Sequence, residues 1–391
     1  MNMSKHSLKP AWPRVPFADV VHLNTDRVAD PAAAGLELYV GIEHITPGDL
    51  RVRSWGLVAE GTTFTNHFRP GQVLFPKRRA YQRKVAVADF EGVCSGDIYV
   101  FESRDPAVLL PDLLPFICQT DGFFDHAVGT SAGSLSPRTN WSHLAAYEFP
   151  LPPPDEQRRL VEVLRAAQVA KEENQELISA SRKLAEAFSK HSLTRFRDQC
   201  PLVELPELTT RITVGIVVRP ATWYVPEGTG VPALRSLNVS PGGLVLDNLV
   251  HISHEGHELH AKSQLFPGDV VIVRTGRPGD AAVIPDGFGP LNCIDLVITT
   301  PNDKLMPEYL VAYLNSPFGR TSFLAGKTGT AQEHFNVGQF KKIVIPCPDR
   351  TAQEHFIQEL TSIERMNQYA ESRYQKTVRL YSCLIGELTG G

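Results

Sequence analysis

Two long stretches of the chain carry apolar or small residues at alternating intervals of three and four positions. The first runs from Asp155 to about Arg197 and contains neither Pro nor Gly, and the second runs from Phe356 to Leu388. A sustained period of about 3.5 residues is typical of the seam of a coiled coil. The pattern therefore predicts two long helices, and a helix of about 40 residues would extend roughly 60 Å.

One polar amide interrupts each seam, Asn174 in the first helix and Asn367 in the second. A single Asn in such a seam can fix the register and the number of strands, so both are candidate coiled-coil register residues. The two helices either pack against each other or each pack against the globular part that precedes it. We expect them to form an antiparallel coiled coil, which would relate the two halves of the chain by a pseudo-two-fold axis.

About 150 residues of mixed pattern precede each helix. Short β-branched runs at 97–101 and 269–273 predict strands. Runs at 111–120 and 307–316 open with Pro and predict short helices with Pro near the first turn. We therefore expect α/β (α+β) globular domains in tandem, each followed by a long helix. The predicted segments are a first globular domain at 1–150, a central helix at 151–198, a second globular domain at 199–348 and a C-terminal helix at 349–391.

The chain contains the same pattern twice. Pro150 and Gln157 recur as Pro346 and Gln353, in each case 196 positions later. Matches at offsets of 196 to 198 continue upstream, and small insertions in loops account for the drift. A single Pro-Gly match could arise by chance, but one register over some fifty residues indicates a tandem duplication. The upstream matches join Pro111 to Pro307, 68–73 to 265–270, and Asp97 to Asp295.

The overall composition excludes several classes of protein. The 391 residues carry a formal net charge of −4, so charge alone cannot supply affinity for nucleic acid, and any such contact must come from local patches. The six cysteines form no CxxC pair, which argues against a zinc ribbon or a disulfide framework. Neither a signal peptide nor an apolar stretch of eighteen residues occurs, so we expect a cytoplasmic protein with no contact to a membrane.

A basic loop follows one strand in each copy, and the two loops differ in their side chains. Arg can pair with guanine, Gln with adenine and Lys with phosphate. Two unlike loops at one repeated position are what two readers of different sequences would carry, and the alternative is a solvated basic loop. The candidate DNA-binding residues are Lys77, Arg78, Arg79, Tyr81, Gln82, Arg83 and Lys84 in the first copy, Arg274, Thr275 and Arg277 in the second, and additionally Arg51, Arg53 and Lys327.

Three enzyme-like motifs fail on inspection. The segment 315–318, Asn-Ser-Pro-Phe, is similar to the motif with which amino-methyltransferases bind a flipped base, but its first Pro is Ser. Lys327 follows a glycine, yet Thr321 stands where a phosphate loop requires Gly. Four histidines recur every third residue, which would spiral around a helix, so a polar turn and short helix fits them better than a metal site. These are His251, His254, His257 and His260.

The doubled order of motifs resembles the specificity subunit of type I restriction-modification enzymes. The resemblance is carried by Pro-Gly strand motifs at 70–74 and 267–271, by the segment 313–318, and by the Pro-x-Pro junctions that open both long helices. It covers almost the whole chain after about residue 15. One departure is Gln72, which stands where the second copy has Asp269.

This resemblance implies a non-catalytic subunit. In such a subunit, each globular domain recognises one half of an asymmetric bipartite DNA target, and the helices act as a spacer. DNA methyltransferase (modification) subunits, two in number, would hold the helical region and bring S-adenosylmethionine, so this chain needs no cofactor and no metal. Restriction or translocase subunits could join them. The alternative from another class is a duplicated coiled-coil scaffold whose globular domains bind proteins.

Overall fold

The computed structural model describes residues 12–325 and 337–388. By its internal contacts the chain forms two units of similar size. Unit 1 contains residues 1–176 and 371–391, and unit 2 contains residues 177–370. Each unit therefore consists of one globular part, the beginning of the long helix that follows it, and the end of the other long helix. The division of the chain into four domains, as expected from the sequence, stays a prediction.

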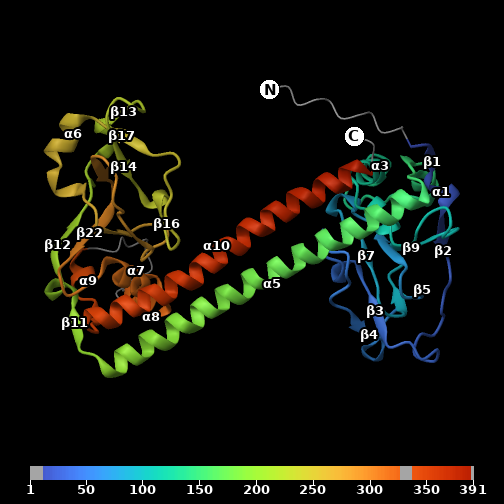
Figure 1. Cartoon of the computed structure of the whole chain (residues 1–391), viewed down its shortest axis with the longest axis horizontal. Helices are drawn as coiled ribbons and strands as arrows, with labels where there is room; N and C mark the ends of the chain where they lie inside the picture. The colour runs from blue at the N-terminus through green and yellow to red at the C-terminus, as the bar shows by residue number, and fades with distance from the viewer. Residues whose placement is uncertain (1–11, 326–336, 389–391) are drawn as a thin grey trace. The chain divides into compact units, whose positions relative to one another are not determined.

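The globular part of unit 1 is built on two four-stranded sheets (Figure 1). One sheet has the order β2-β9-β6-β7 and is antiparallel throughout, and the other has the order β4-β3-β8-β5, in which β3 and β8 are parallel. The strands of the first sheet are β2 (Val21–Asn24), β9 (Ile98–Ser103), β6 (Val73–Pro76) and β7 (Ala86–Val87). Those of the second are β4 (Gly56–Leu57), β3 (Leu38–Val40), β8 (Gly92–Cys94) and β5 (Asn66–Phe68).

Unit 2 repeats this arrangement. Its antiparallel sheet has the order β12-β22-β19-β20, and its second sheet has the order β13-β17-β14-β21-β18, with β14 and β21 parallel. The strands of the first sheet are β12 (Thr209–Val214), β22 (Leu296–Pro301), β19 (Val270–Val273) and β20 (Ala281–Val283). The others are β13 (Tyr224–Val225), β17 (Val250–Ile252), β14 (Val231–Leu234), β21 (Leu291–Cys293), β18 (Gln264–Leu265), and the hairpin β15 (Val239–Ser240) with β16 (Gly243–Leu244).

A two-stranded antiparallel ribbon joins the beginning and the end of each globular part. In unit 1 it pairs β1 (Arg14–Pro16) with β10 (Glu148–Pro150), and in unit 2 it pairs β11 (Leu202–Glu204) with β23 (Val344–Pro346). The proline-rich segments that the sequence predicts to be extended are therefore strands of these ribbons. In each unit, the second strand of the ribbon leads directly into a long helix.

Short helices pack on the sheets. Unit 1 has α1 (Phe17–Val20), α2 (Leu114–Ile117), α3 (Asp121–Gly129), α4 (Trp141–Ala145) and the 3-10 turns η1 (Ile42–His44), η2 (Val58–Glu60) and η3 (Ala80–Gln82). Unit 2 has α6 (His254–Leu259), α7 (Pro307–Asn315), α8 (Pro317–Ala325), α9 (Val337–Lys341) and the 3-10 turns η4 (Leu205–Glu207), η5 (Pro220–Trp223), η6 (Ser236–Asn238) and η7 (Ala261–Ser263). The helix expected over 307–316 is α7, with Pro at its first turn. Its counterpart expected over 111–120 is only α2, because Pro115 is restricted to the first turn and the helix starts just before it.

The two predicted long helices are α5 (Pro154–Gln199) and α10 (Arg350–Glu387). Segments of both run antiparallel within each unit. In unit 1 the Lys171 ammonium lies 5.1 Å from the centre of the Tyr381 ring, and in unit 2 Phe188 stacks on Phe356 at 5.6 Å between ring centres. Among the described residues, no helix has the length and apolarity needed to cross a membrane.

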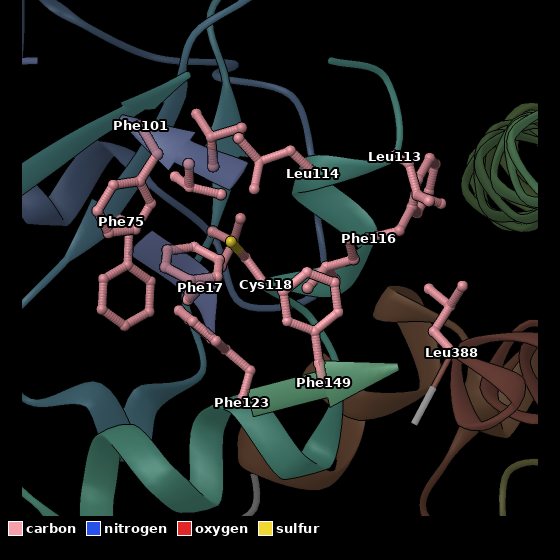
Figure 2. Packing of buried hydrophobic residues seen from close by; sticks show 14 of the residues in the cluster. Phe17, Phe75, Phe101, Leu113, Leu114, Phe116, Cys118, Phe123, Phe149 and Leu388 are labelled. Carbon is pink, nitrogen blue, oxygen red and sulfur yellow. The ribbon is translucent and has the colours of Figure 1, made fainter. Parts of the chain in front are cut away.

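The helices also pack on the globular parts, so both arrangements considered from the sequence occur together. The core of unit 1 is rich in Phe, and Figure 2 shows Phe17, Phe75, Phe101 and Cys118 in one cluster, with Leu388 toward its edge. Leu160, Val161 and Leu164 of α5 and Ile385 of α10 belong to the same cluster. In unit 2, Leu193 and Phe196 of α5 and Phe356 of α10 belong to the corresponding core cluster.

A buried glutamine anchors each long helix with the same three hydrogen bonds. Gln157 accepts from the Leu110 N–H and donates to the carbonyls of Val108 and Pro152, each at 2.8 Å. Gln353 accepts from the Met306 N–H at 2.8 Å and donates to Lys304 and Pro348 at 2.9 Å. Every partner lies 196 positions from its counterpart. The structure therefore confirms the predicted duplication at the level of individual atoms.

Candidate nucleic-acid interface

The first basic loop leaves the sheet of unit 1 at the end of β6. All four residues of β6 are buried, so the chain reaches the surface only after Pro76. The backbone of Lys77 then bonds on both sides, since its N–H donates to Asp97 and its carbonyl accepts from Thr139, each at 2.9 Å. The loop is therefore held between the turn before β9 and the segment 131–139.

Two arginines in the left-handed region bracket η3. Arg79 has φ 58° and Arg83 has φ 55°, a conformation that is uncommon for residues other than Gly. The counterpart of Arg79 in unit 2 is Gly276, which has φ 85° and adopts this region without strain. Unit 1 thus keeps a long cationic side chain at a backbone position where unit 2 has glycine. Strained non-Gly residues of this kind cluster at functional sites.

Asp97 gathers two arginines at the base of this loop. Arg78 lies 3.4 Å from its carboxylate and Arg138 lies 3.1 Å from it. Arg78 also donates to the Ser136 hydroxyl at 2.5 Å. The sequence reasoning missed Arg138, because it lies some sixty residues along the chain and no motif marks it. Only the pairing of 131–139 with the loop brings it into place.

The other basic residues of the loop differ in the contacts that their side chains already make within the protein. Lys77 lies 4.9 Å from the centre of the Tyr99 ring, and Lys84 donates to the Ile42 carbonyl at 2.8 Å. Arg83 forms an ion pair with Asp121. Arg79 is exposed and pairs with no carboxylate among residues 12–325 and 337–388.

Aromatic and amide groups accompany these cations. Tyr81 is 54% exposed, and Gln82 beside it is half-buried. A ring and an amide next to exposed arginine are suited to stacking and to hydrogen bonding on bases. Arg79 and Tyr81 therefore form the most accessible part of the loop.

The second loop is built on the equivalent aspartate but is neutralised more completely. Arg274 is only 12% exposed and lies 2.7 Å from Asp295, which also accepts from the Thr275 hydroxyl at 3.1 Å. Arg277 lies 3.4 Å from the buried carboxylate of Asp280. The predicted Lys327 lies outside the described residues.

An apolar pair lies at the same edge of the unit 2 sheet, and the sequence reasoning missed it. Val217 is 49% exposed and Val218 is 77% exposed, just beyond the end of β12. The Asp295 N–H donates to the Ile216 carbonyl at 3.1 Å, which places this pair beside the second basic loop. Exposed methyl groups suit contact with the methyl group of thymine. A run of β-branched residues ending at Arg219-Pro220 was the available signal.

Arg51 and Arg53 are directed toward the long helix of unit 1. The Glu172 carboxylate lies 3.7 Å from Arg51 and 3.1 Å from Arg53. The hydrogen bond that Arg53 donates to Asp49 raises the pKa of Arg53, and burial lowers it by less. Lys171 donates to the Gly48 carbonyl at 2.7 Å. These contacts join the loop 48–53 to α5.

The two seam amides bond differently. Asn174, which is 5% exposed, donates to the Ala170 carbonyl one turn earlier. The Asn367 carbonyl accepts from the Ser181 hydroxyl of the facing helix at 3.0 Å. Their role in fixing the register stays a prediction.

The four histidines lie in a strand and a short helical segment. His251 belongs to β17, His254 and His257 to α6, and His260 follows that helix. His257 bonds to the Asn292 side chain at 3.1 Å, and burial is the main cause that lowers its pKa. Over the described residues, no group of three His, Cys, Asp or Glu side chains is arranged to bind a metal ion. The predicted short helix is confirmed.

Comparison of the sequence with known proteins gives one informative match. The chain is 31% identical over 149 residues to the EcoDI type I restriction enzyme specificity subunit of Escherichia coli. The match covers 35% of this chain and 32% of that protein, so it spans about a third of the length of this relative. No family model matches the chain.

Two solved structures share the fold over nearly the whole chain. The S subunit of a type I restriction-modification system from M. genitalium has a TM-score of 0.64 and 12% identity, and it covers 100% of this chain and 98% of its own. A chain from a structure on complex assembly and conformational transition of the type I R-M system has a TM-score of 0.57 and 20% identity, with 98% and 99% covered. In sequence over one stretch and in fold over its length, the chain resembles the specificity subunits of type I restriction-modification enzymes, as its doubled motifs predict.

Proposed function

We propose that this chain is the sequence-specific DNA-recognition subunit of a type I restriction-modification complex. It reads an asymmetric bipartite target, with one globular part for each half-site, and it has no catalytic site of its own. The observation that carries the proposal is the pair of unlike loops on one repeated framework. Asp97 and Asp295 occupy equivalent positions, yet the groups around them differ.

The partners follow from the same proposal. DNA methyltransferase subunits would bind to the helical region and supply S-adenosylmethionine, and restriction or translocase subunits would join the complex. The structure of a related chain that describes assembly of the type I R-M system supports this view. Because its target is the DNA of the cell, the complex would act in the cytoplasm.

In unit 1, Arg79 and Tyr81 would contact the DNA, with Lys77 beside them. Their exposure leaves them available, whereas Arg78 and Arg138 would position the loop through Asp97. In unit 2, the exposed face of Arg277 and the Val217–Val218 pair would read the other half-site. A site read partly through apolar contacts would favour thymine, while an exposed Arg favours guanine.

A reversal of charge in the first loop tests this assignment. We expect Lys77→Glu with Arg79→Glu to weaken binding of the target duplex by the partner-bound complex about a hundredfold or more, because attraction to phosphates becomes repulsion. The matched control is Arg27→Glu with Arg104→Glu, the same change of charge on exposed residues of the globular part of unit 1. Equal loss in both variants, or loss in neither, would contradict the assignment.

A second test concerns the division of the target into two halves. Residues 1–150 would be exchanged for those of another specificity subunit, and the methylated bases of the host genome would be mapped. We expect one half-site to change and the other to stay the same. A change in both halves would refute the two-reader proposal, and unaltered methylation would favour a scaffold whose globular parts bind proteins.

A further inference from the structure

A groove of about 900 Å³ lies in unit 2 between the end of α5, the beginning of α10 and helix α7. Its floor is apolar, and carboxylates stand at its margin. The described residues that line it include Ala185, Ala312, Ile357, Leu360, Glu308 and Glu364. Unit 1 has the same framework, and its corresponding residues show how this space is occupied there.

The duplication gives each of these six residues a counterpart 196 positions away. Ala185 of unit 2 corresponds to Tyr381 of unit 1, and Ala312 corresponds to Phe116. In unit 1 these two rings pack together with 6.4 Å between their centres, and the Tyr381 hydroxyl donates to Gln119. Two aromatic rings therefore fill in unit 1 the space that two alanines leave open in unit 2.

The residues beneath the rings respond to this difference. Val161 and Leu164 of unit 1 are 6% and 0% exposed. Their counterparts in unit 2, Ile357 and Leu360, remain only half-buried. Apolar side chains at the floor of the groove are thus left partly in contact with water. Binding of an apolar group there would be favourable, because it would remove this surface from water.

The charges at the margin differ as well. In unit 1 the Asp112 carboxylate lies 2.5 Å from Arg165. In unit 2 the corresponding residues are Glu308 and Thr361, so the acid is kept and its cation is lost. Glu364 adds a second carboxylate where unit 1 has Gln168. Neither Glu308 nor Glu364 forms an ion pair with another residue in the described part of the chain.

Three cations also line the groove, and they do not neutralise these acids. Arg320 pairs with the buried Asp280 at 2.8 Å. Lys183 and Lys190 are exposed on α5, and within the described ranges no ion pair joins either of them to Glu308 or Glu364. The margin formed by α7 and α10 is therefore acidic.

We propose that this groove is a docking site for a segment of a partner protein, present in unit 2 and absent from unit 1. The segment inserts an aromatic side chain between Ala185 and Ala312 and places a basic side chain beside Glu308 and Glu364. It supplies from outside what Tyr381, Phe116 and Arg165 supply within unit 1. The inference does not depend on the proposed recognition of DNA, and it makes unit 2 different from unit 1 in partner binding.

Small peptides test this chemistry on the full chain. The probes are acetyl-Arg-Tyr-amide, acetyl-Glu-Tyr-amide and acetyl-Arg-Ala-amide, with binding followed by saturation-transfer NMR on the peptide protons. We expect acetyl-Arg-Tyr-amide to bind about tenfold more tightly than either of the others, because only it offers both groups. No binding of this peptide, or equal binding of all three, would overturn the proposal.

Two variants locate the binding. Ala312→Phe introduces the ring that unit 1 carries, and we expect it to reduce binding of acetyl-Arg-Tyr-amide at least tenfold. Glu308→Lys changes an exposed residue and leaves the groove open, and it should shift the preference toward acetyl-Glu-Tyr-amide. Unchanged binding in both variants would place the peptide elsewhere and refute the site.

Sedimentation of the full chain tests whether the groove instead binds a second copy of this chain. If the groove received a second copy of this chain, the protein would dimerise with concentration and Ala312→Phe would abolish the dimer. That result would overturn the assignment to a different protein. A monomer at all concentrations, with the peptide preference above, supports it.

Discussion

The two units share their internal framework and differ at their surfaces. Gln157 and Gln353 make the same hydrogen bonds, and both central sheets have the same strand order. In contrast, the first basic loop keeps an exposed Arg79 where the second has Gly276, and the groove of unit 2 is filled by aromatic rings in unit 1. After the duplication, therefore, the buried contacts that specify the fold were kept while the loops and the helix faces diverged. Four predictions test this contrast between a shared framework and diverged surfaces.

The largest difference in stability between the two units should come from replacing Leu164 and its counterpart Leu360. Leu164→Ala removes a side chain that is 0% exposed, so we expect a loss of about 3 to 5 kcal/mol in the free energy of unfolding of unit 1. Leu360→Ala removes a half-buried side chain from the open groove, and its cost should be about 1 kcal/mol. Native-state amide hydrogen exchange of each unit measures both values. Equal losses would mean that the groove of unit 2 is as well packed as its counterpart.

The anchoring glutamines should instead behave alike. Gln157→Leu leaves the Leu110 N–H and two carbonyls without their partner in a buried position, and we expect a loss of about 2 to 3 kcal/mol in unit 1. Gln353→Leu should cost unit 2 the same amount, because its three bonds are the same. The measurement is again hydrogen exchange, read from the amides at the start of α5 and α10. Losses that differ by more than about 1 kcal/mol would show that the frameworks have diverged too.

Local patterns in the sequence predicted the features that depend on neighbouring residues. The period of 3.5 residues marked α5 and α10 to within a few residues, and the β-branched runs marked β9 and β19. The offset of 196 led to the duplication and to the strand-by-strand equivalence of the two units. These features follow from spacing along the chain alone.

Features that depend on distant residues could not be predicted in this way. Arg138 joins the basic loop only through Asp97 and the pairing of 131–139, and Arg51 and Arg53 turn to Glu172 instead. The groove results from the absence of two rings, at Ala185 and Ala312, which no motif would reveal. Such contacts require the tertiary structure, because the residues involved are far apart in the sequence.

The departure at Gln72 offers a prediction with a pH dependence. The Gln72 amide donates to Glu102 at 2.6 Å, whereas in unit 2 the Thr300 hydroxyl donates to Asp269 at 2.5 Å, so donor and acceptor have exchanged places. Gln72→Glu would bring two carboxylates together. The repulsion raises the pKa of a carboxyl above its usual value of about 4.3, so the folded state binds the extra proton.

The sign of the effect follows from this proton. The free energy of unfolding of the variant should fall as the pH rises from about 4.3 through the raised pKa, with a total loss of about 1 to 2 kcal/mol by pH 7. Denaturation of unit 1 across this range measures it. The double variant Gln72→Glu with Glu102→Gln restores one donor and one acceptor and should recover most of the loss. A loss that does not change with pH would point to altered packing as the cause.

The smallest expected effect on stability comes from replacing Arg51 and Arg53. The same variant also tests whether the loop 48–53 contacts DNA. Their side chains are 63% and 49% exposed and pair with Glu172, so replacing both with Ala should cost unit 1 no more than about 1 kcal/mol. Raising the salt concentration should reduce this difference further, because exposed pairs are screened. Since these arginines are engaged with α5, the double variant should bind the target duplex within about twofold of the unaltered chain, measured at one fixed salt concentration. A loss as large as that expected for Lys77→Glu with Arg79→Glu would instead extend the reading surface from the basic loop to the loop 48–53, and the helix contacts would then be secondary to DNA binding.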